Sequence, residues 1–256
     1  MTPIRGILLD IDGVLHVGGK IVPGASETLA TLSERGIPFR CLSNTTRKCR
    51  ATIATTLRDM GLFVPENHIV TPAAAAAALL AERGQKRCLL LTTGDTFRDF
   101  SAEGIIDTRD EPDAVVIGDA GDVFTYASMN RAFRAVLDGA AFIALEKDRY
   151  WMDSDGLSLS AGPFVRGIEF AAGREAELVG KPSAAFFARA LDTLGTAPDE
   201  TLMVGDDVVT DIGGAHRAGM RGFLVRTGKF REEQAVAAVP APGRIIESIA
   251  SLPDFL

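Results

Sequence analysis

The sequence is poor in cysteine, histidine and tryptophan, with three, three and one of them among 256 residues. Cys41, Cys49 and Cys88 are odd in number and contain no C-x-x-C pair, so a disulfide framework is not expected. The histidines are scattered and match no zinc-binding spacing. These shortages argue against a secreted disulfide-rich fold and a zinc site, and they favour reduced thiols in a cytoplasmic protein.

Long apolar runs and basic clusters are also missing. No apolar stretch approaches the ~18 residues that a membrane-spanning helix needs. Residues 1–6 lack the charged-then-apolar layout of a secretory signal. The net charge is −7, and no run of lysine and arginine could follow a nucleic-acid backbone. We therefore expect no membrane or nucleic-acid partner, and a small molecule as the substrate.

Short β-type runs alternate with helical patterns, which is typical of a parallel sheet with helices on its faces. The expected strands are residues 4–10, 38–43, 87–92, 114–118, 142–145, 201–205 and 222–226. The expected helices include residues 25–35, 47–60 and 72–83, the last opened by a proline and rich in alanine. Because these strands are too many for one small sheet, the fold class that we predict is α/β with two domains.

The two domains are not separated by a glycine- or serine-rich linker, so the second must be an insertion with short connections. We place a Rossmann-like parallel-sheet core in residues 1–70 and 180–256, and an inserted α/β domain in residues 71–179. Gly18 and Gly19 lie between two short β-type runs and indicate a hairpin soon after the first strand.

Two of the expected strands end in aspartates. Asp10, Asp12 and Gly13 follow one apolar run, and Asp206 and Asp207 follow another near the far end of the chain. Because the carboxyl ends of parallel strands meet at one edge of a sheet, these side chains can share one crevice. Clustered carboxylates repel one another unless a cation joins them, and hard oxygen ligands favour Mg²⁺. The sequence therefore predicts a magnesium site that handles phosphate.

A third strand also ends in an acidic tip, at Gly118 and Asp119. Any parallel strand tends to end in glycine and a polar residue, so one acidic tip alone is weak evidence. We assign Asp119 and Asp122 to an ordinary loop.

Phosphoryl transfer through a covalent intermediate needs an ionised nucleophile and a proton for the leaving group. Asp10 can be the nucleophile, because a carboxyl group with its ordinary pKa of about 3.9 is ionised at pH 7. Asp12 can handle the proton if burial raises its pKa. Gly13 would let the backbone turn tightly and offer an N–H group to the phosphate.

The phosphoryl oxygens also need donors and a counter-charge. Ser43 and Asn44 close the second expected strand and could supply the donors, although helix capping is the favoured explanation for these residues taken alone. Lys181 precedes a proline suited to the first turn of a helix, so its ammonium lies near a corner between a strand and a helix. A lone lysine is usually solvated, but the order of acid pair, hydroxyl, lysine and acid pair makes these ordinary explanations jointly improbable.

That order resembles the four motifs of the haloacid dehalogenase superfamily of aspartyl-phosphate hydrolases, and the match covers nearly the whole chain. The segments that carry it are Asp10 to Leu15, Ser43 with Asn44, Lys181, and Gly205 to Asp207 with Asp211. The resemblance implies a Mg²⁺-dependent phosphatase in which Asp10, the backbone carbonyl of Asp12, and Asp206 bind the metal. Asp207 and Asp211 would be supporting or water-mediated partners.

The insertion resembles the α/β cap of the subfamily that contains the bacterial nucleotide phosphatase NagD. Residues 142–151, 162–164 and 179–182 are similar to the group that includes phospholysine phosphohistidine inorganic pyrophosphate phosphatase, with Trp151 where tyrosine is expected. The resemblance implies a small phosphorylated metabolite, a phosphoamidate or pyrophosphate as substrate, and a homodimer formed through the cap.

Three alternatives stay open. A phosphotransferase or mutase would use the same motifs and pass the phosphoryl group to an alcohol instead of water. A phospho-receiver module also uses an acidic pair, an acceptor aspartate, a hydroxyl and a lysine, but there the acidic pair precedes the acceptor. A catalytically weak scaffold could keep the fold for binding alone.

Overall fold

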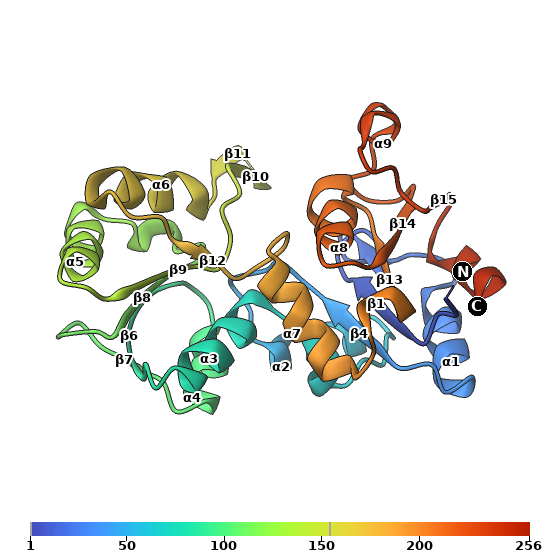
Figure 1. Cartoon of the computed structure of the whole chain (residues 1–256), viewed down its shortest axis with the longest axis horizontal. Helices are drawn as coiled ribbons and strands as arrows, with labels where there is room; N and C mark the ends of the chain where they lie inside the picture. Colours follow the sequence, from blue (N-terminus) through green and yellow to red (C-terminus); the bar gives the residue numbers. More distant parts are fainter. Residues whose placement is uncertain (1, 154) are drawn as a thin grey trace. The chain divides into compact units, whose positions relative to one another are not determined.

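The computed structural model describes residues 2–153 and 155–256, and the chain divides into two compact units (Figure 1). Unit 1 consists of Met1–Ser43, Ile53–Val70 and Lys181–Leu256. Unit 2 consists of Asn44–Thr52 and Thr71–Gly180. The sequence analysis assigned residues 44–52 to the core, whereas the structure groups them with unit 2.

Unit 1 is built on a six-stranded parallel sheet with the strand order β15-β14-β13-β1-β4-β5. Its strands are β1 (Gly6–Asp10), β4 (Phe39–Leu42), β5 (Ile69–Val70), β13 (Thr201–Gly205), β14 (Arg221–Val225) and β15 (Arg244–Ile246). Every residue of β1 and β13 is buried, as expected for central strands covered on both faces. The two strands are adjacent, with Leu9 beside Val204, so their carboxyl ends lie together.

Helices cover this sheet. They are α1 (Ala25–Glu34), α2 (Arg50–Asp59), α7 (Ala184–Leu194), α8 (Gly213–Arg217) and α9 (Glu232–Ala237), with short turns η1 (Glu66–His68), η3 (Pro198–Glu200), η4 (Val208–Ile212) and η5 (Ile249–Phe255). Leu29 of α1 and Leu57 of α2 share a core with the Ile7 and Leu9 side of β1. On α7, Phe186 and Phe187 are fully buried.

The expected helix over residues 47–60 begins later, at Arg50. Acidic side chains from unit 2 satisfy the backbone N–H groups at this start. The N–H group of Cys49 donates to Asp95 at 2.8 Å, and that of Arg50 donates to Asp99 at 3.2 Å. Carboxylates that cap free amides at a helix N-terminus are favourable, so the acceptors fix the first turn here.

The predicted hairpin is confirmed. The strands β2 (His16–Val17) and β3 (Lys20–Ile21) pair antiparallel around Gly18 and Gly19. Both glycines have positive φ values, of 55° and 78°, as the two-residue turn requires.

Unit 2 has its own five-stranded parallel sheet, in the order β12-β9-β8-β6-β7, and a separate hairpin β10-β11. The strands are β6 (Arg87–Leu91), β7 (Ile106–Asp107), β8 (Ala114–Ile117), β9 (Ala141–Ala144), β10 (Tyr150–Asp153), β11 (Gly156–Leu159) and β12 (Glu177–Leu178). The helices are α3 (Pro72–Glu82), α4 (Phe97–Ala102), α5 (Tyr126–Leu137) and α6 (Ala161–Ala172), with a short turn η2 (Gly121–Val123). The α/β fold class with two parallel sheets is thus confirmed.

Two charged side chains of unit 2 are used to hold its own backbone. Glu146 is buried and accepts hydrogen bonds from the Ser160 hydroxyl at 2.6 Å and from the N–H group of Ala161, at the start of α6. Lys147 donates to Glu169 at 2.7 Å and to the Ala176 carbonyl. These two charges therefore stabilise α6 and the chain that follows it.

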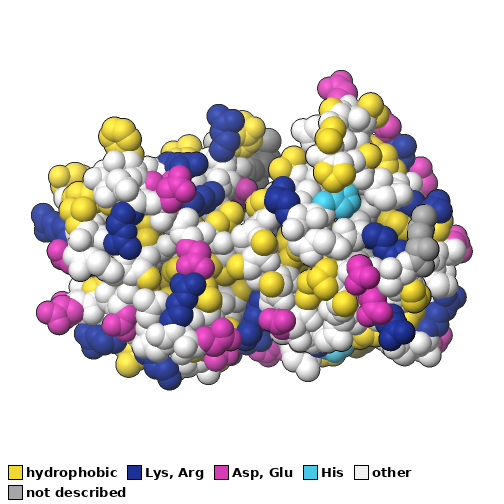
Figure 2. Space-filling view, viewed as in Figure 1, with side chains coloured by type: hydrophobic (Ala, Val, Ile, Leu, Met, Phe, Trp, Pro, Cys, Tyr) yellow, Lys and Arg dark blue, Asp and Glu magenta, His cyan; other side chains and the backbone are white. Residues whose placement is uncertain are grey.

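The cysteines are free and buried. Within the described part of the chain, no helix is both long and apolar enough to cross a membrane. Figure 2 shows acidic and basic side chains mixed with hydrophobic ones over the face that it displays.

Candidate active site

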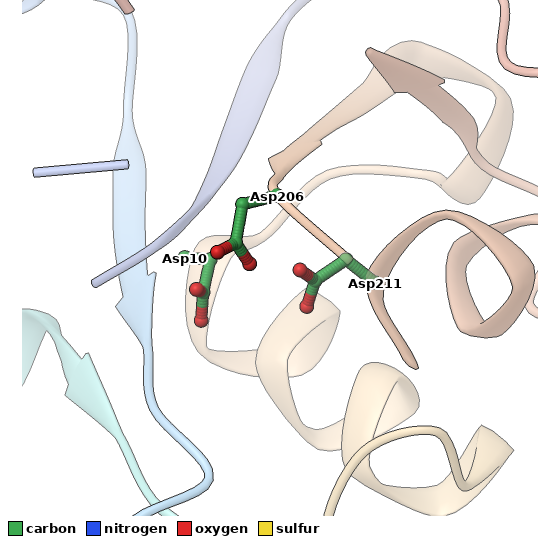
Figure 3. Close-up of side chains that lie close together, drawn as sticks. All are labelled: Asp10, Asp206 and Asp211. Carbon is green, nitrogen blue, oxygen red and sulfur yellow. The ribbon is translucent and has the colours of Figure 1, made fainter. Parts of the chain in front are cut away.

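Three aspartates come together at the carboxyl edge of the unit 1 sheet. Asp10 is the last residue of β1, Asp206 directly follows β13, and Asp211 lies in η4, which follows in turn. Their carboxylates point toward one another in Figure 3. One oxygen of each lies within 4.8 Å of the others, and all three residues are buried. The strand ends thus place Asp10 and Asp206 together as the sequence predicts.

A buried ammonium lies among these carboxylates. Lys181 is 4% exposed, and its Nζ donates to Oδ1 of Asp10 and, at 2.7 Å, to Oδ1 of Asp211. Lys181, from the third motif, is therefore in direct contact with Asp10, from the first motif, although the two are far apart in the chain. One positive charge faces three potential negative charges, so the cluster is short of positive charge when all three aspartates are ionised.

The shortage of positive charge in the cluster affects the pKa values of its members. Burial raises the pKa of Asp10 well above its ordinary value; Asp211 and Asp206 add to the rise, and Lys181 opposes it. Burial also raises the pKa of Asp206 to about 6, although the N–H group of Lys229 favours the ionised form. For Lys181 burial alone would lower the pKa, but Asp10 and Asp211 outweigh it and raise the pKa above the usual lysine value. A further cation would relieve this repulsion.

Two glycines form a cradle around Asp206. Gly13 and Gly228 have φ values of 97° and 65°, and a Cβ atom on either would collide with the Asp206 carboxylate. The N–H group of Lys229 donates to Oδ2 of Asp206 at 2.7 Å, and the Thr227 hydroxyl donates to the Gly13 carbonyl. The carboxylate is thus fixed by backbone that only glycine can supply at these two positions.

The N–H group of Gly13, which the sequence analysis directed toward phosphate, donates to the His16 carbonyl at 2.7 Å. Asp12 lies outside the carboxylate cluster, with its side chain 66% exposed and its Oδ1 3.6 Å from Nε2 of His16. The Asp12 side chain is therefore not buried as we had supposed. It lies at the surface beside a histidine.

Asp207 and Asp211 have different structural roles. Oδ1 of Asp207 accepts from the N–H groups of Val209 and Thr210 at 2.8 and 3.0 Å, so this residue caps η4, a π-helical turn. Asp211 was expected as a supporting partner, yet its carboxylate is one of the three that could hold a metal ion. A Cβ atom on Gly205 would collide with Asp211, so the tip of β13 is shaped to admit this side chain.

Ser43 and Asn44 fall on different sides of the division between the units. Ser43 is buried and follows β4, whose Leu42 pairs with Asp10, and its N–H group donates to the Val70 carbonyl at 3.1 Å. It therefore lies just past the end of the strand beside Asp10, at the same edge of the sheet. Asn44 belongs to unit 2.

Asp119 serves the structure of unit 2, which fits its assignment to a loop. Its carboxylate accepts from Nε of Arg47 at 2.9 Å and from the N–H group of Gly121. Its own N–H group donates to the Thr46 hydroxyl at 2.9 Å. These bonds hold the segment before α2 against the end of β8.

Two family models match the chain. Residues 7–105 match one described as haloacid dehalogenase-like hydrolase, and residues 178–252 match another described as HAD-hydrolase-like. The bovine haloacid dehalogenase-like hydrolase domain-containing protein 2 is 41% identical over 99% of this chain and 96% of its own. The chain belongs to the haloacid dehalogenase-like hydrolases.

Further relatives identify this haloacid dehalogenase-like hydrolase as a phosphatase. Bovine phospholysine phosphohistidine inorganic pyrophosphate phosphatase is 40% identical over the whole of this chain and 95% of its own. The solved structure of NagD from E. coli K-12 superposes with a TM-score of 0.89, at 30% identity and 98% coverage of both chains. A Mycobacterium tuberculosis glycerol phosphate phosphatase, solved in complex with magnesium, gives 0.86 at 28% identity, covering 97% of this chain and 76% of that one. The predicted resemblance is thus confirmed.

The site of this phosphatase fits a divalent cation. Asp10, Asp206 and Asp211 offer only hard oxygen donors, as Mg²⁺ prefers, and they are buried close together with too little positive charge. The glycine cradle holds one of the three in place. The raised pKa values of Asp10 and Asp206 are what such a cluster shows before a cation joins it.

We predict that Mg²⁺ raises the melting temperature of this phosphatase more at pH 7.5 than at pH 5. Asp206 has a pKa of about 6, so below that pH its carboxyl group is protonated and the proton competes with the metal. Differential scanning fluorimetry with and without MgCl₂ measures the shift. In Asp206→Asn the Mg²⁺ effect should be largely lost at both pH values, whereas Asp59→Asn, on the exposed end of α2, should behave like the wild type. An equal Mg²⁺ shift in Asp206→Asn would contradict the assignment.

Proposed function

We propose that this phosphatase depends on Mg²⁺ and hydrolyses a small phosphorylated metabolite, a phosphoamidate or pyrophosphate through an aspartyl-phosphate on Asp10. The observation that carries the proposal is the contact of one buried lysine, Lys181, with both Asp10 and Asp211, beside Asp206. This arrangement combines a carboxylate at a strand end with positive charge for phosphate. Nucleophilic attack and charge neutralisation both need these groups in one place.

Asp10 is the proposed nucleophile. In the first step a carboxylate oxygen of Asp10 forms a bond to phosphorus, and the bond from phosphorus to the leaving oxygen or nitrogen breaks. In the second step water attacks the phosphorus, which releases phosphate and restores the carboxylate. Lys181 holds Asp10 in place and supplies a counter-charge for the phosphoryl oxygens. Ser43, on the neighbouring strand, is a proposed donor to these oxygens, and Asn44 is assigned the same role on the family pattern.

Asp12 is the proposed proton carrier. It gives a proton to the leaving group in the first step and takes one from water in the second. Its exposed side chain is separate from the three clustered carboxylates, so the proton carrier is not tied to a metal through its carboxylate. Gly13 forms the turn that follows it.

Asp10, Asp206 and the backbone carbonyl of Asp12 are the proposed Mg²⁺ ligands, and Asp211 supports them together with Asp207. When bound, the ion would neutralise charge on the phosphoryl group in a protein whose net charge is −7. Asp211 already shares Lys181 with Asp10, which suits a residue that orients the nucleophile.

The insertion of residues 71–179, which makes up most of unit 2, is the proposed cap of the family, and we assign to it the selection of the leaving group. We also propose that the protein acts in the cytoplasm, where its free cysteines would stay reduced.

We predict that Asp10→Asn lowers kcat by at least about a thousandfold, because an amide cannot form the acyl phosphate. Hydrolysis of para-nitrophenyl phosphate with Mg²⁺ measures this, and Asp59→Asn is the control. Acid quenching during turnover, followed by borohydride reduction, should convert Asp10 to homoserine, which peptide mass spectrometry detects. Wild-type turnover in pure Asp10→Asn, or reduction at another aspartate, would sink the proposal.

We predict that Asp12→Asn slows hydrolysis of an alkyl phosphate by about 10²–10⁴-fold. It should slow hydrolysis of para-nitrophenyl phosphate much less, because that leaving group departs without a proton. Comparing kcat for glycerol phosphate and para-nitrophenyl phosphate in wild type and variant gives the ratio. An equal loss on both substrates would show that Asp12 positions the site instead of moving the proton.

We propose a homodimer that forms through unit 2. Four large apolar side chains of this unit are more than half exposed, on the β10-β11 hairpin and on α6: Tyr150, Leu157, Leu159 and Phe170. Burying such side chains against a second copy would remove apolar surface from water. Sedimentation should give twice the mass of the 27.2 kDa chain, and Leu157→Asp with Leu159→Asp should give the monomer. A wild type that sediments only as the 27.2 kDa species at micromolar concentration excludes this dimer.

A further inference from the structure

A groove of about 800 Å³ lies on unit 2, between the outer face of α5 and the turn that joins β7 to β8. Its volume is in the range of sites that hold small-molecule ligands. All residues that line it belong to unit 2, whereas Asp10, Asp206 and Lys181 belong to unit 1. The groove is therefore a feature separate from the catalytic cluster.

Three arginines line this groove: Arg109 from the turn, and Arg131 and Arg134 from α5. In residues 2–153 and 155–256, none of the three has a hydrogen bond or an ion pair with another side chain. Five other arginines of the same unit do pair with carboxylates, namely Arg47, Arg50, Arg83, Arg98 and Arg166. The groove thus gathers guanidinium groups whose donors are still available.

The walls that carry these arginines are well fixed. On one side, α5 starts with a capping box in which the side chains of Thr125 and Ser128 each accept from the other's backbone N–H group. On the other side, the guanidinium of Arg87 donates to the Asp110 carbonyl at 2.8 Å and the N–H group of Arg87 donates to Asp113. Donors on fixed backbone lose little freedom when a ligand binds.

We propose that this groove binds the phosphate group of a small phosphorylated molecule. Guanidinium groups match phosphate oxygens with paired, charge-assisted N–H donors. The groove also contains Glu111 and Asp138, so it is not uniformly basic. Asp138 ends α5 about 6 Å along the helix axis beyond Arg134, and it can accept hydroxyl donors from the body of a phosphate ester.

An exposed aromatic ring stands at the other end of the groove. Tyr126 opens α5 and is 84% exposed, and it lies about 12 Å along the helix axis from Arg134. A planar group of the ligand can stack on this ring, whereas a phosphate ion alone has no ring to stack. Adenosine monophosphate carries both a phosphate and a planar base, so it serves as the probe, with inorganic phosphate and adenosine as its two halves.

The test is an amide NMR titration of ¹⁵N-labelled Asp10→Asn protein in EDTA, so that turnover cannot consume the probe. Adenosine monophosphate and inorganic phosphate should both give saturable shifts for amides of residues 109–112 and 126–138, and adenosine should not. Arg131→Ala with Arg134→Ala should weaken this binding by at least about tenfold, since charge-assisted bonds are lost. Alanine is a better helix former than arginine, so α5 should stay folded.

Lys86→Ala is the matched control, because it removes an exposed positive charge of the same unit outside the groove. It should leave the titration unchanged. The proposal is overturned if these amides do not shift at millimolar probe, if the double substitution has no effect, or if chloride and sulfate give the same response. The positions of the shifts, and not turnover, decide the outcome, so it does not depend on the role of Asp10.

Discussion

The contact of Lys181 with Asp10 and Asp211 is the interaction on which the site depends. Three carboxylates within 4.8 Å of one another, all buried, would repel strongly if no cation lay among them. The desolvation of a buried charge is expensive, and a buried pair is tolerated only when its geometry is good and its other polar atoms are satisfied. The ammonium of Lys181 meets this condition by donating to both neighbours. Lys181 thereby opposes the rise in the pKa of Asp10 that burial and the two neighbouring carboxylates cause.

The surrounding backbone is shaped to hold these charges at close range. Parallel pairing of β1 and β13 brings Asp10 and Asp206 to one edge, and their fully buried strands leave little room for movement. Gly13 and Gly228 enclose Asp206, and Gly205 leaves space for Asp211. A methyl group at any of these three positions would push a carboxylate aside. Glycine is needed at these positions because the backbone passes so close to a carboxylate that a Cβ atom would collide with it. At Gly13 and Gly228 the backbone also has a positive φ, which glycine adopts without strain.

The elements predicted correctly from the sequence are those that neighbouring residues determine. Short apolar runs predicted the central strands, and Gly18 with Gly19 predicted the hairpin, because burial of a strand and the type of a turn depend on residues adjacent in the chain. Prediction from the sequence failed where distant residues decide. The start of α2 depends on Asp95 and Asp99, more than forty residues away, and the placement of residues 44–52 follows from the same contacts. The close approach of Asp211 depends on a π-helical turn, which has no simple sequence pattern.

Trp151, Glu146 and Lys147 act on the structure of unit 2. Trp151, where the resemblance led us to expect tyrosine, has its ring under the guanidinium of Arg47, whose Cζ lies 4.7 Å from the ring centroid. Tryptophan offers the largest ring face for such a cation–π contact, so Trp151 helps to hold Arg47 in place. Arg47 also pairs with Asp119 at 2.9 Å, so its charge is already engaged. Glu146 and Lys147 are likewise used internally. The charges of Arg47, Glu146 and Lys147 are thus engaged by contacts within unit 2.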